Sequence, residues 1–170
     1  GQLEYQTIGH KPPVGICGSG ILDAIAQLQL ADVLNRRGVL RKESALVREG
    51  AHGTEVVIAA APHTRHGRDI VLNRKDISEI QLAKGAIAAG IKILCDYASV
   101  NFEQIDRLYI TGSFGTHISV KSAIVTGLIP DIPEQRIEFV DNGAGRGAIL
   151  SLGNQEFRDR VRSLRNQLEV

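Results

Sequence analysis

The longest regular pattern in the chain is an apolar repeat at intervals of three and four residues. It comprises Ile77, Ile80, Ala83, Ile87, Ile91, Leu94 and Ala98. This spacing is the helical period, so we predict one long helix over residues 76–99, about 35 Å in length at about 1.5 Å per residue. Its middle, residues 84–90 (KGAIAAG), is unusually small. Each of the two internal glycines lowers the stability of the helix by roughly 1 kcal/mol relative to alanine. Such a loss is explained if another element or a ligand lies close to this turn.

Shorter apolar runs on either side predict alternating strands and helices. Strands are expected over residues 2–8, 55–61, 70–73, 108–110 and 137–140. Helices are expected over residues 21–35, 120–127 and 155–168, with another beginning near residue 147. Residues 39–75 form a β-rich excursion and residues 153–170 a terminal helix. This alternation favours an α/β fold, a mixed sheet flanked by helices, and 170 residues suffice for a single domain with a buried core.

Glycine-rich segments lie beside three of these elements. One follows the strand at 108–110, one follows the strand at 137–140, and one opens the first long helix. Glycine lets the backbone approach a ligand, and ligands of open α/β sheets bind at the carboxyl ends of strands. We therefore predict a shared ligand cleft, although each segment alone is also explained as a tight turn. The candidate residues are Gly18, Ser19, Gly20, Gly112, Ser113, Phe114, Gly115, Asp141, Gly143, Ala144 and Gly147.

Several common site types are not indicated. No glycine turn is followed by Lys-Ser or Lys-Thr, and no G-x-G-x-x-G occurs with a suitable strand and acidic partner, so neither a Walker loop nor a Rossmann site is expected. We identify no catalytic residue and no metal site. His63 and His66 have no third ligand at convincing spacing and fit a hairpin tip, whereas His117 either touches a ligand or lies on a surface loop.

The two cysteines suggest different environments. Cys17 precedes glycines at a predicted helix start, where the pKa of a thiol can be lowered. Cys95 lies inside the long helix and fits a small buried apolar residue. Neither has a C-x-x-C partner, so no iron–sulfur cluster is expected within this chain.

Composition indicates which binding partners and which cellular compartment to expect. The formal net charge of +1 argues against nucleic-acid binding. No segment approaches the roughly 20 apolar residues of a membrane helix, so no membrane association is expected. Two cysteines do not form a disulfide framework, which favours the cytoplasm. The chain contains no methionine, including at position 1, and we interpret it as a piece of a longer protein.

Five segments together resemble a known family. PPVGICGSGILDAIAQL, DISEIQLAKGAIAAGIKIL, LYITGSFG, SAIVTGLIP and DNGAGRGAILSL occur in this order. They resemble the C-terminal region of the reductive activators of corrinoid proteins, which belong to the acetate and sugar kinase, heat-shock chaperone and actin superfamily. The resemblance covers residues 9–152. It implies a ribonuclease-H-like half of an actin-like ATPase fold, in which two such halves close over ATP and Mg.

The resemblance also implies roles for the glycine segments. Residues 112–115 would match the adenosine motif, whose glycines contact the sugar and the α-phosphate. Residues 141–147 would match the second connecting motif at the hinge between the halves. Residues 18–20 would line the cleft from the other side, and the small helical stretch 85–90 would pack beside it. The Asp-x-Gly-Thr phosphate motifs are absent from this sequence, and Ser113 stands where a further glycine is expected.

The function implied is that of the nucleotide-binding half of an ATP-dependent activator. Such an activator supports electron transfer from a two-iron, two-sulfur domain, absent from this chain, to a corrinoid protein. We expect no catalysis from this chain alone. The expected partners are the N-terminal half of the same protein and the corrinoid protein, with self-association possible when that half is missing. Two alternatives stay open: a protein-interaction module that uses no nucleotide, and part of a small-molecule kinase of the same superfamily.

Overall fold

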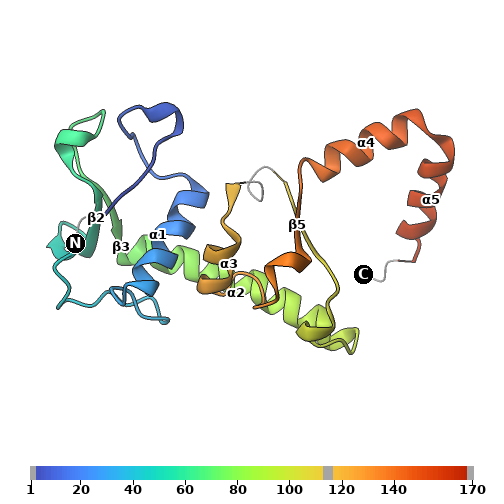
Figure 1. Cartoon of the computed structure of the whole chain (residues 1–170), viewed down its shortest axis with the longest axis horizontal. Coiled ribbons are helices and arrows are strands. Elements are labelled where there is room, and N and C mark those ends of the chain that lie inside the picture. The colour runs from blue at the N-terminus through green and yellow to red at the C-terminus, as the bar shows by residue number, and fades with distance from the viewer. Residues whose placement is uncertain (1–2, 113–116, 168–170) are drawn as a thin grey trace.

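The computed structural model describes residues 3–112 and 117–167. The longest helix runs along much of the length of the molecule, and the strands form two separate groups (Figure 1). The α-helices are α1 (Gly18–Leu30), α2 (Arg74–Tyr97), α3 (Val120–Thr126), α4 (Gly143–Gly153) and α5 (Gln155–Arg165). The strands are β1 (Val47–Gly50), β2 (Gly53–Ala59), β3 (Ile70–Asn73), β4 (Leu108–Thr111) and β5 (Ile137–Val140). Short 3-10 turns lie at Ile8–His10, Ala61–His63, Phe102–Gln104 and Glu134–Arg136.

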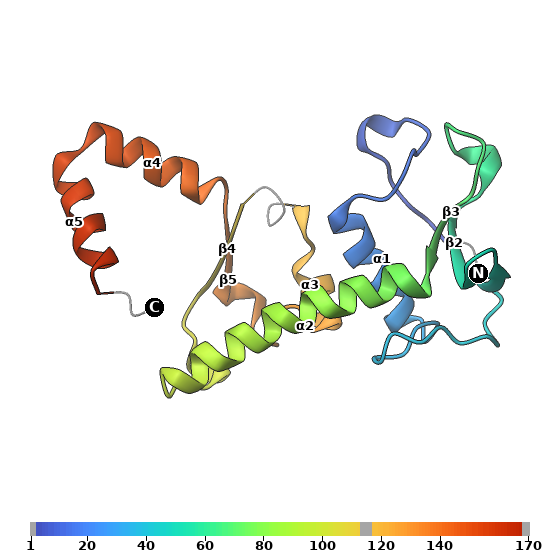
Figure 2. The same ribbon diagram turned by 180° about the vertical axis from the view of Figure 1, so that it is seen from behind.

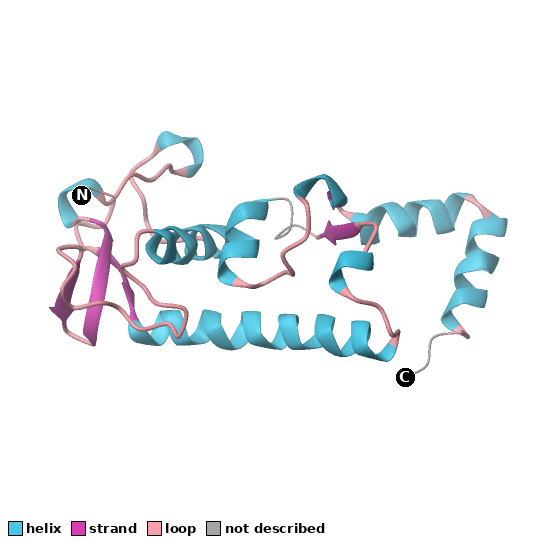
Figure 3. Ribbon diagram, turned by 60° about the horizontal axis from the view of Figure 1, so that its bottom comes forward, coloured by secondary structure: helices cyan, strands magenta, loops and turns pink. Residues whose placement is uncertain are grey.

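The strands pair in two different ways. β1, β2 and β3 form an antiparallel sheet in that order, with a register shift between Val57 and Ala59. β4 and β5 form a parallel pair, in which Leu108 lies opposite Ile137 and Thr111 opposite Val140. The antiparallel sheet lies at one end of α2, and the parallel pair lies farther along it (Figure 2, Figure 3). The α/β prediction, with mixed strand directions and flanking helices, is confirmed.

The main core lies between α1, the first turn of α2 and the antiparallel sheet. Its most buried side chains come from all three elements and from the segment after α1; they are Ile25, Leu28, Val33, Leu34, Leu40, Val56, Leu72 and Ile77. A smaller cluster joins Leu22 of α1 to Ala123 of α3. Lys84 of α2 donates to the carbonyl of Thr126 at the end of α3. These contacts hold α1, α2 and α3 together.

The long predicted helix is confirmed as α2. Asn73 accepts hydrogen bonds from the backbone N–H groups of Lys75 (2.8 Å) and Asp76 (3.1 Å), and the Asp76 carboxylate accepts from the N–H of Asn73 (3.0 Å). This capping box satisfies N–H groups that a helix start otherwise leaves unpaired. It fixes the first residue of the helix at Arg74, two residues before the predicted start.

Other boundaries differ from the predictions. Residues 3–7 have no regular structure and Ile8–His10 is a 3-10 turn, so the predicted strand at 2–8 is wrong for the described residues. α1 ends at Leu30 rather than near residue 35, because Asp32 takes a positive φ of 55°. Val33 and Leu34 still reach the core, and Leu34 bridges to Leu40. The β-rich segment at residues 39–75 contains one strand, β1, that was not predicted.

The second glycine cluster is helical. The glycines of residues 143–147 predict a turn with a helix after it, but α4 already begins at Gly143. Asn142 makes this possible: its φ is 43°, and its side-chain oxygen accepts a hydrogen bond from the N–H of Gly145 at 3.1 Å. An asparagine cap stabilises a helix start even where glycines follow.

Much apolar surface is uncovered along the molecule. Ile77 is the one buried residue of α2, and Gly85 and Gly90 have no atom within 4 Å of the position a Cβ would take. Lys84 at the start of this turn reaches the end of α3, but no described residue packs against its two glycines. α4 and α5 extend away from the body as an arm (Figure 1). In the described part of the chain, no helix combines the length and apolarity needed to cross a membrane.

Candidate functional site

Thr111 joins the two strands that precede the predicted ligand segments. Because β4 and β5 are parallel, their carboxyl ends meet at one edge of the sheet. The Thr111 hydroxyl at the end of β4 donates to the carbonyl of Val140 at the end of β5, at 2.9 Å. The same oxygen accepts a hydrogen bond from the N–H of Gly143 at 3.0 Å. One side chain thus connects the first and second glycine segments.

Gly112 continues directly from this connection. Its φ is 97°, a conformation that residues with a Cβ rarely adopt, and no atom of the described residues lies within 4 Å of where a Cβ would be. Within the described part of the chain, nothing therefore fills the space beside this backbone. Ser113, Phe114 and Gly115 lie outside the described residues.

The second glycine segment provides a helix start at the same edge. Asp141 and Ala144 are exposed, whereas Gly143 is half-buried against Thr111. A Cβ at Gly143 would lie 2.5 Å from the Thr111 oxygen, so this glycine is required by a close approach. Gly147 lies one turn farther along α4 with no atom within 4 Å of its Cβ direction.

The third segment begins α1. Cys17 is its N-cap, and its sulfur accepts a hydrogen bond from the N–H of Gly20 at 3.4 Å. The Ser19 hydroxyl lies 3.4 Å from the same sulfur. These interactions, that of Ser19 first, lower the pKa of the exposed Cys17 thiol because they stabilise the thiolate. The Gly20 N–H is therefore already paired, rather than free for an anion.

The three glycine segments lie toward the same side of the molecule. α1 packs against α3, and both helices begin toward the edge where β4 and β5 end (Figure 1, Figure 2). Of the described site residues, those that follow β4 and β5 are brought into hydrogen-bond contact through Thr111. Those at the start of α1 belong to the neighbouring helix pair.

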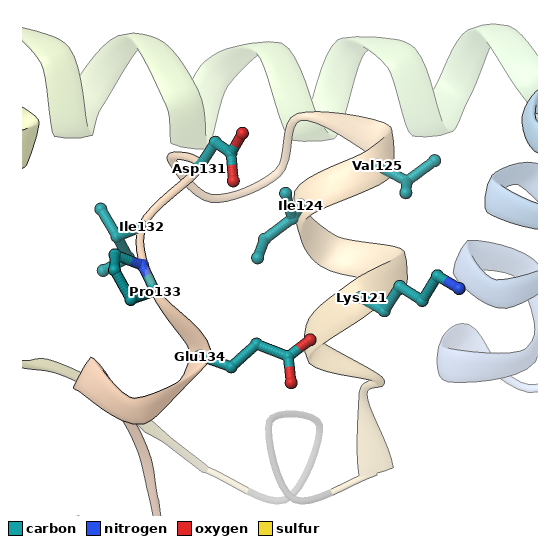
Figure 4. A pocket seen from close by; sticks show the side chains of 7 residues that line it. All are labelled: Lys121, Ile124, Val125, Asp131, Ile132, Pro133 and Glu134. Carbon is teal, nitrogen blue, oxygen red and sulfur yellow. The ribbon is translucent and has the colours of Figure 1, made fainter.

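A different set of residues lines the pocket shown in Figure 4. This pocket has a volume of about 480 Å³ and lies between α3 and the segment at 131–134. Its lining residues are Lys121, Ile124, Val125, Asp131, Ile132, Pro133 and Glu134. None of them was predicted, because apolar residues around a proline-rich connection look like ordinary packing in sequence. The pocket is shallow and mixes one cation with two carboxylates, which suits no single ligand class.

The histidines of the hairpin tip have structural surroundings. His66 accepts a hydrogen bond through Nδ1 from the N–H of Arg68 at 3.1 Å, and His63 ends a 3-10 turn in an exposed position. Within residues 3–112 and 117–167, no three His, Cys, Asp or Glu side chains gather as a set of metal ligands.

Comparisons with known proteins show the family of the chain. The chain is 34% identical over 165 residues to a corrinoid activation enzyme, RamQ, of Eubacterium limosum, covering 92% of this chain and 28% of that protein. Its structure is similar to that of a solved reductive activator for a corrinoid, iron–sulfur protein, with a TM-score of 0.84 and 37% identity over 95% of this chain and 26% of the other. The chain therefore spans about a quarter of the length of each of these two relatives. A family model described as the C-terminal domain of RACo, the ASKHA domain, matches residues 1–170 in full, and the chain belongs to that family.

Proposed function

We propose that this chain is the nucleotide-binding half of an ATP-dependent reductive activator of corrinoid proteins. The observation that carries the proposal is the Thr111 connection, which puts two glycine segments at one edge of a parallel strand pair. The names of both relatives, an activation enzyme and a reductive activator, support a corrinoid protein as the target. The two free cysteines fit a reducing cytoplasm.

The residues at this edge are compatible with a nucleotide that lies on the backbone. Gly112 leaves room for it, and Ser113, Phe114 and Gly115 would continue the contact with sugar and α-phosphate. Asp141, Gly143, Ala144 and Gly147 would approach from β5 and α4, and Gly18, Ser19 and Gly20 from α1. ATP with Mg would supply the free energy of domain closure when bound. This chain alone offers no phosphate motif and no catalytic residue, so its part is to bind and to orient.

The other half of the site would come from outside this chain. The large apolar side chains exposed along α2 and α4 include Leu82, Ile87, Ile93, Ile149 and Leu152. Exposed apolar side chains that gather on a surface mark sites of contact with other proteins. In the proposed activator an N-terminal half covers them, and a domain with a two-iron, two-sulfur cluster delivers the electron to the corrinoid protein. Without that cover, the same surfaces would favour self-association.

The test uses the full-length protein that carries this domain. Gly112→Val places a β-branched residue at a φ of 97° in the proposed site. We expect Mg-ATP affinity, measured by titration calorimetry, to fall about tenfold or more, which corresponds to roughly 1.4 kcal/mol. Gly53→Val is the matched control, because Gly53 has a φ of 93° and no described atom within 4 Å of its Cβ direction, but begins β2 in the β1–β2 hairpin.

Each outcome separates the candidate functions. Unchanged affinity in Gly112→Val, or an equal loss in Gly53→Val, would contradict the site assignment. If the wild-type full-length protein binds no ATP yet retains a protein partner, the protein-interaction module is the better account. If it transfers phosphate from ATP to a sugar or an acid, the chain is part of a small-molecule kinase.

A further inference from the structure

A basic surface lies on two loops at the end of the molecule opposite α5. The loops comprise residues 8–14 and residues 60–68, and both project from the same end (Figure 1). They contain no Asp or Glu. Their exposed basic side chains and histidines are His10, Lys11, His63, Arg65, His66 and Arg68. We call this set the two-loop basic surface.

The positive charges of this surface lack carboxylate partners among the described residues. Lys11, Arg65 and Arg68 take part in none of the ion pairs found there. The nearest carboxylate in sequence, Asp69, is engaged elsewhere: it pairs with Arg48 at 2.7 Å and accepts from the N–H of Ala61 at 2.6 Å. Three cations without carboxylate partners therefore lie on two neighbouring loops that contain no acidic residue, which makes this surface locally positive.

Hydrogen bonds within the second loop, residues 60–68, fix its conformation. The buried Thr64 hydroxyl bonds to two carbonyls, those of Arg68 at 2.8 Å and Ala61 at 3.1 Å. The N–H of Arg65 donates to the carbonyl of Pro13 at 3.0 Å, which joins the two loops. A surface whose backbone is already ordered loses less conformational entropy on binding.

We propose that the two-loop basic surface docks an acidic face of the corrinoid protein that the activator reduces. This rests on the proposed function. A protein is favoured over a nucleic acid because three charges on two short loops give no extended stripe along which a phosphate backbone could lie. The name of the 37%-identical relative gives a corrinoid, iron–sulfur protein as the target of that relative. Complementary charge would raise the rate of encounter and orient the two proteins.

The experiment measures association of the full-length activator with a purified corrinoid, iron–sulfur protein by surface plasmon resonance across a salt series. The variant is Arg65→Glu with Arg68→Glu. The control is Arg160→Glu with Arg165→Glu on α5, which changes the net charge equally at the other end of the molecule (Figure 1). We expect the first variant to associate about tenfold more slowly at low salt, with the difference shrinking toward 0.5 M NaCl, roughly, as charges are screened. The control should keep the wild-type rate and salt dependence.

Four results would overturn the proposal or its basis. Wild-type salt dependence and rate in Arg65→Glu/Arg68→Glu would overturn the docking surface, and so would an equal loss in the α5 control. Binding of a fluorescein-labelled DNA duplex that the same variant loses would assign the surface to nucleic acid instead. If the wild-type activator binds Mg-ATP but no corrinoid protein, the proposed function itself is contradicted, and the docking surface with it. Arg65→Ala/Arg68→Ala, with unchanged circular dichroism and Mg-ATP affinity, repeats the test without charge reversal and separates docking from misfolding.

Discussion

Gly143→Ala is the substitution that tests the Thr111 connection most directly. The added Cβ would lie 2.5 Å from the Thr111 oxygen, although it would lie at an ordinary 3.4 Å from Thr111 Cβ. The oxygen cannot simply turn away, because it holds hydrogen bonds to Val140 and Gly143 at the same time. Overpacking of this kind costs about 1–3 kcal/mol, and each lost hydrogen bond adds about 0.5–1.5 kcal/mol where water does not replace it.

The matched substitution is Gly147→Ala, one turn farther along α4. Gly147 has no atom within 4 Å of its Cβ direction, so alanine there gains helix propensity of roughly 0.8–1 kcal/mol without a clash. We therefore expect the two variants to move in opposite directions, with Gly143→Ala less stable than wild type by about 2 kcal/mol. The assay is urea unfolding followed by circular dichroism, read as the change of midpoint at constant slope.

A double-mutant cycle then assigns the cost to Thr111. In Thr111→Ala the oxygen is gone, so adding Gly143→Ala should cost little or nothing further. If Gly143→Ala is as stable as Gly147→Ala, the close approach is not real. If the cost persists undiminished in the Thr111→Ala background, it arises somewhere other than at this contact.

Two further predictions concern groups whose pKa the fold shifts. Burial lowers the pKa of Lys84 below its ordinary 10.5, because the ammonium is partly removed from water. Between the lowered pKa and 10.5 the unfolded chain then binds more protons than the folded one, so the free energy of unfolding should rise with pH across that window. Lys84→Met should abolish this rise, measured by urea unfolding at a series of pH values. The Ser19 hydroxyl lowers the pKa of Cys17, so Ser19→Ala should shift the pH dependence of Cys17 alkylation by iodoacetamide to higher pH; an unshifted profile would assign the lowering to other groups.

The elements that the sequence predicts well are those whose signals are local. The three-and-four repeat and the Asn73–Asp76 cap specify α2 almost without reference to the rest of the chain. β4 and β5 are short apolar runs before glycines, and both lie where predicted. A helix period and a strand followed by a turn depend on neighbours within a few residues, which one sequence contains in full.

The elements that were missed depend on contacts between distant residues. Residues 143–147 look like a turn because three of the five are glycine, yet the Asn142 cap and the bond from Gly143 to Thr111, 32 residues earlier, start a helix there. For the site, the sequence located the glycine segments but not the hydroxyl that joins two of them. Thr111, the last residue of β4 before Gly112, was the available signal, because a hydroxyl at a strand end can reach the neighbouring strand.

The apolar repeat of α2 predicts one buried face, and the structure leaves large apolar side chains open both on that face and on the other side of the helix. Leu94 of the repeat is 68% exposed, and Leu82, Ile93 and Tyr97, outside the repeat, are 74%, 66% and 78% exposed. Burying a large apolar side chain is worth about 1.5–3 kcal/mol, so these four alone represent about as much free energy as the whole stability of a small domain, roughly 5–15 kcal/mol. A sequence does not retain such a pattern by propensity, because alanine or lysine would serve an exposed helix better. The pattern is therefore best explained by a second protein surface along α2, which the proposed activator supplies when its halves meet.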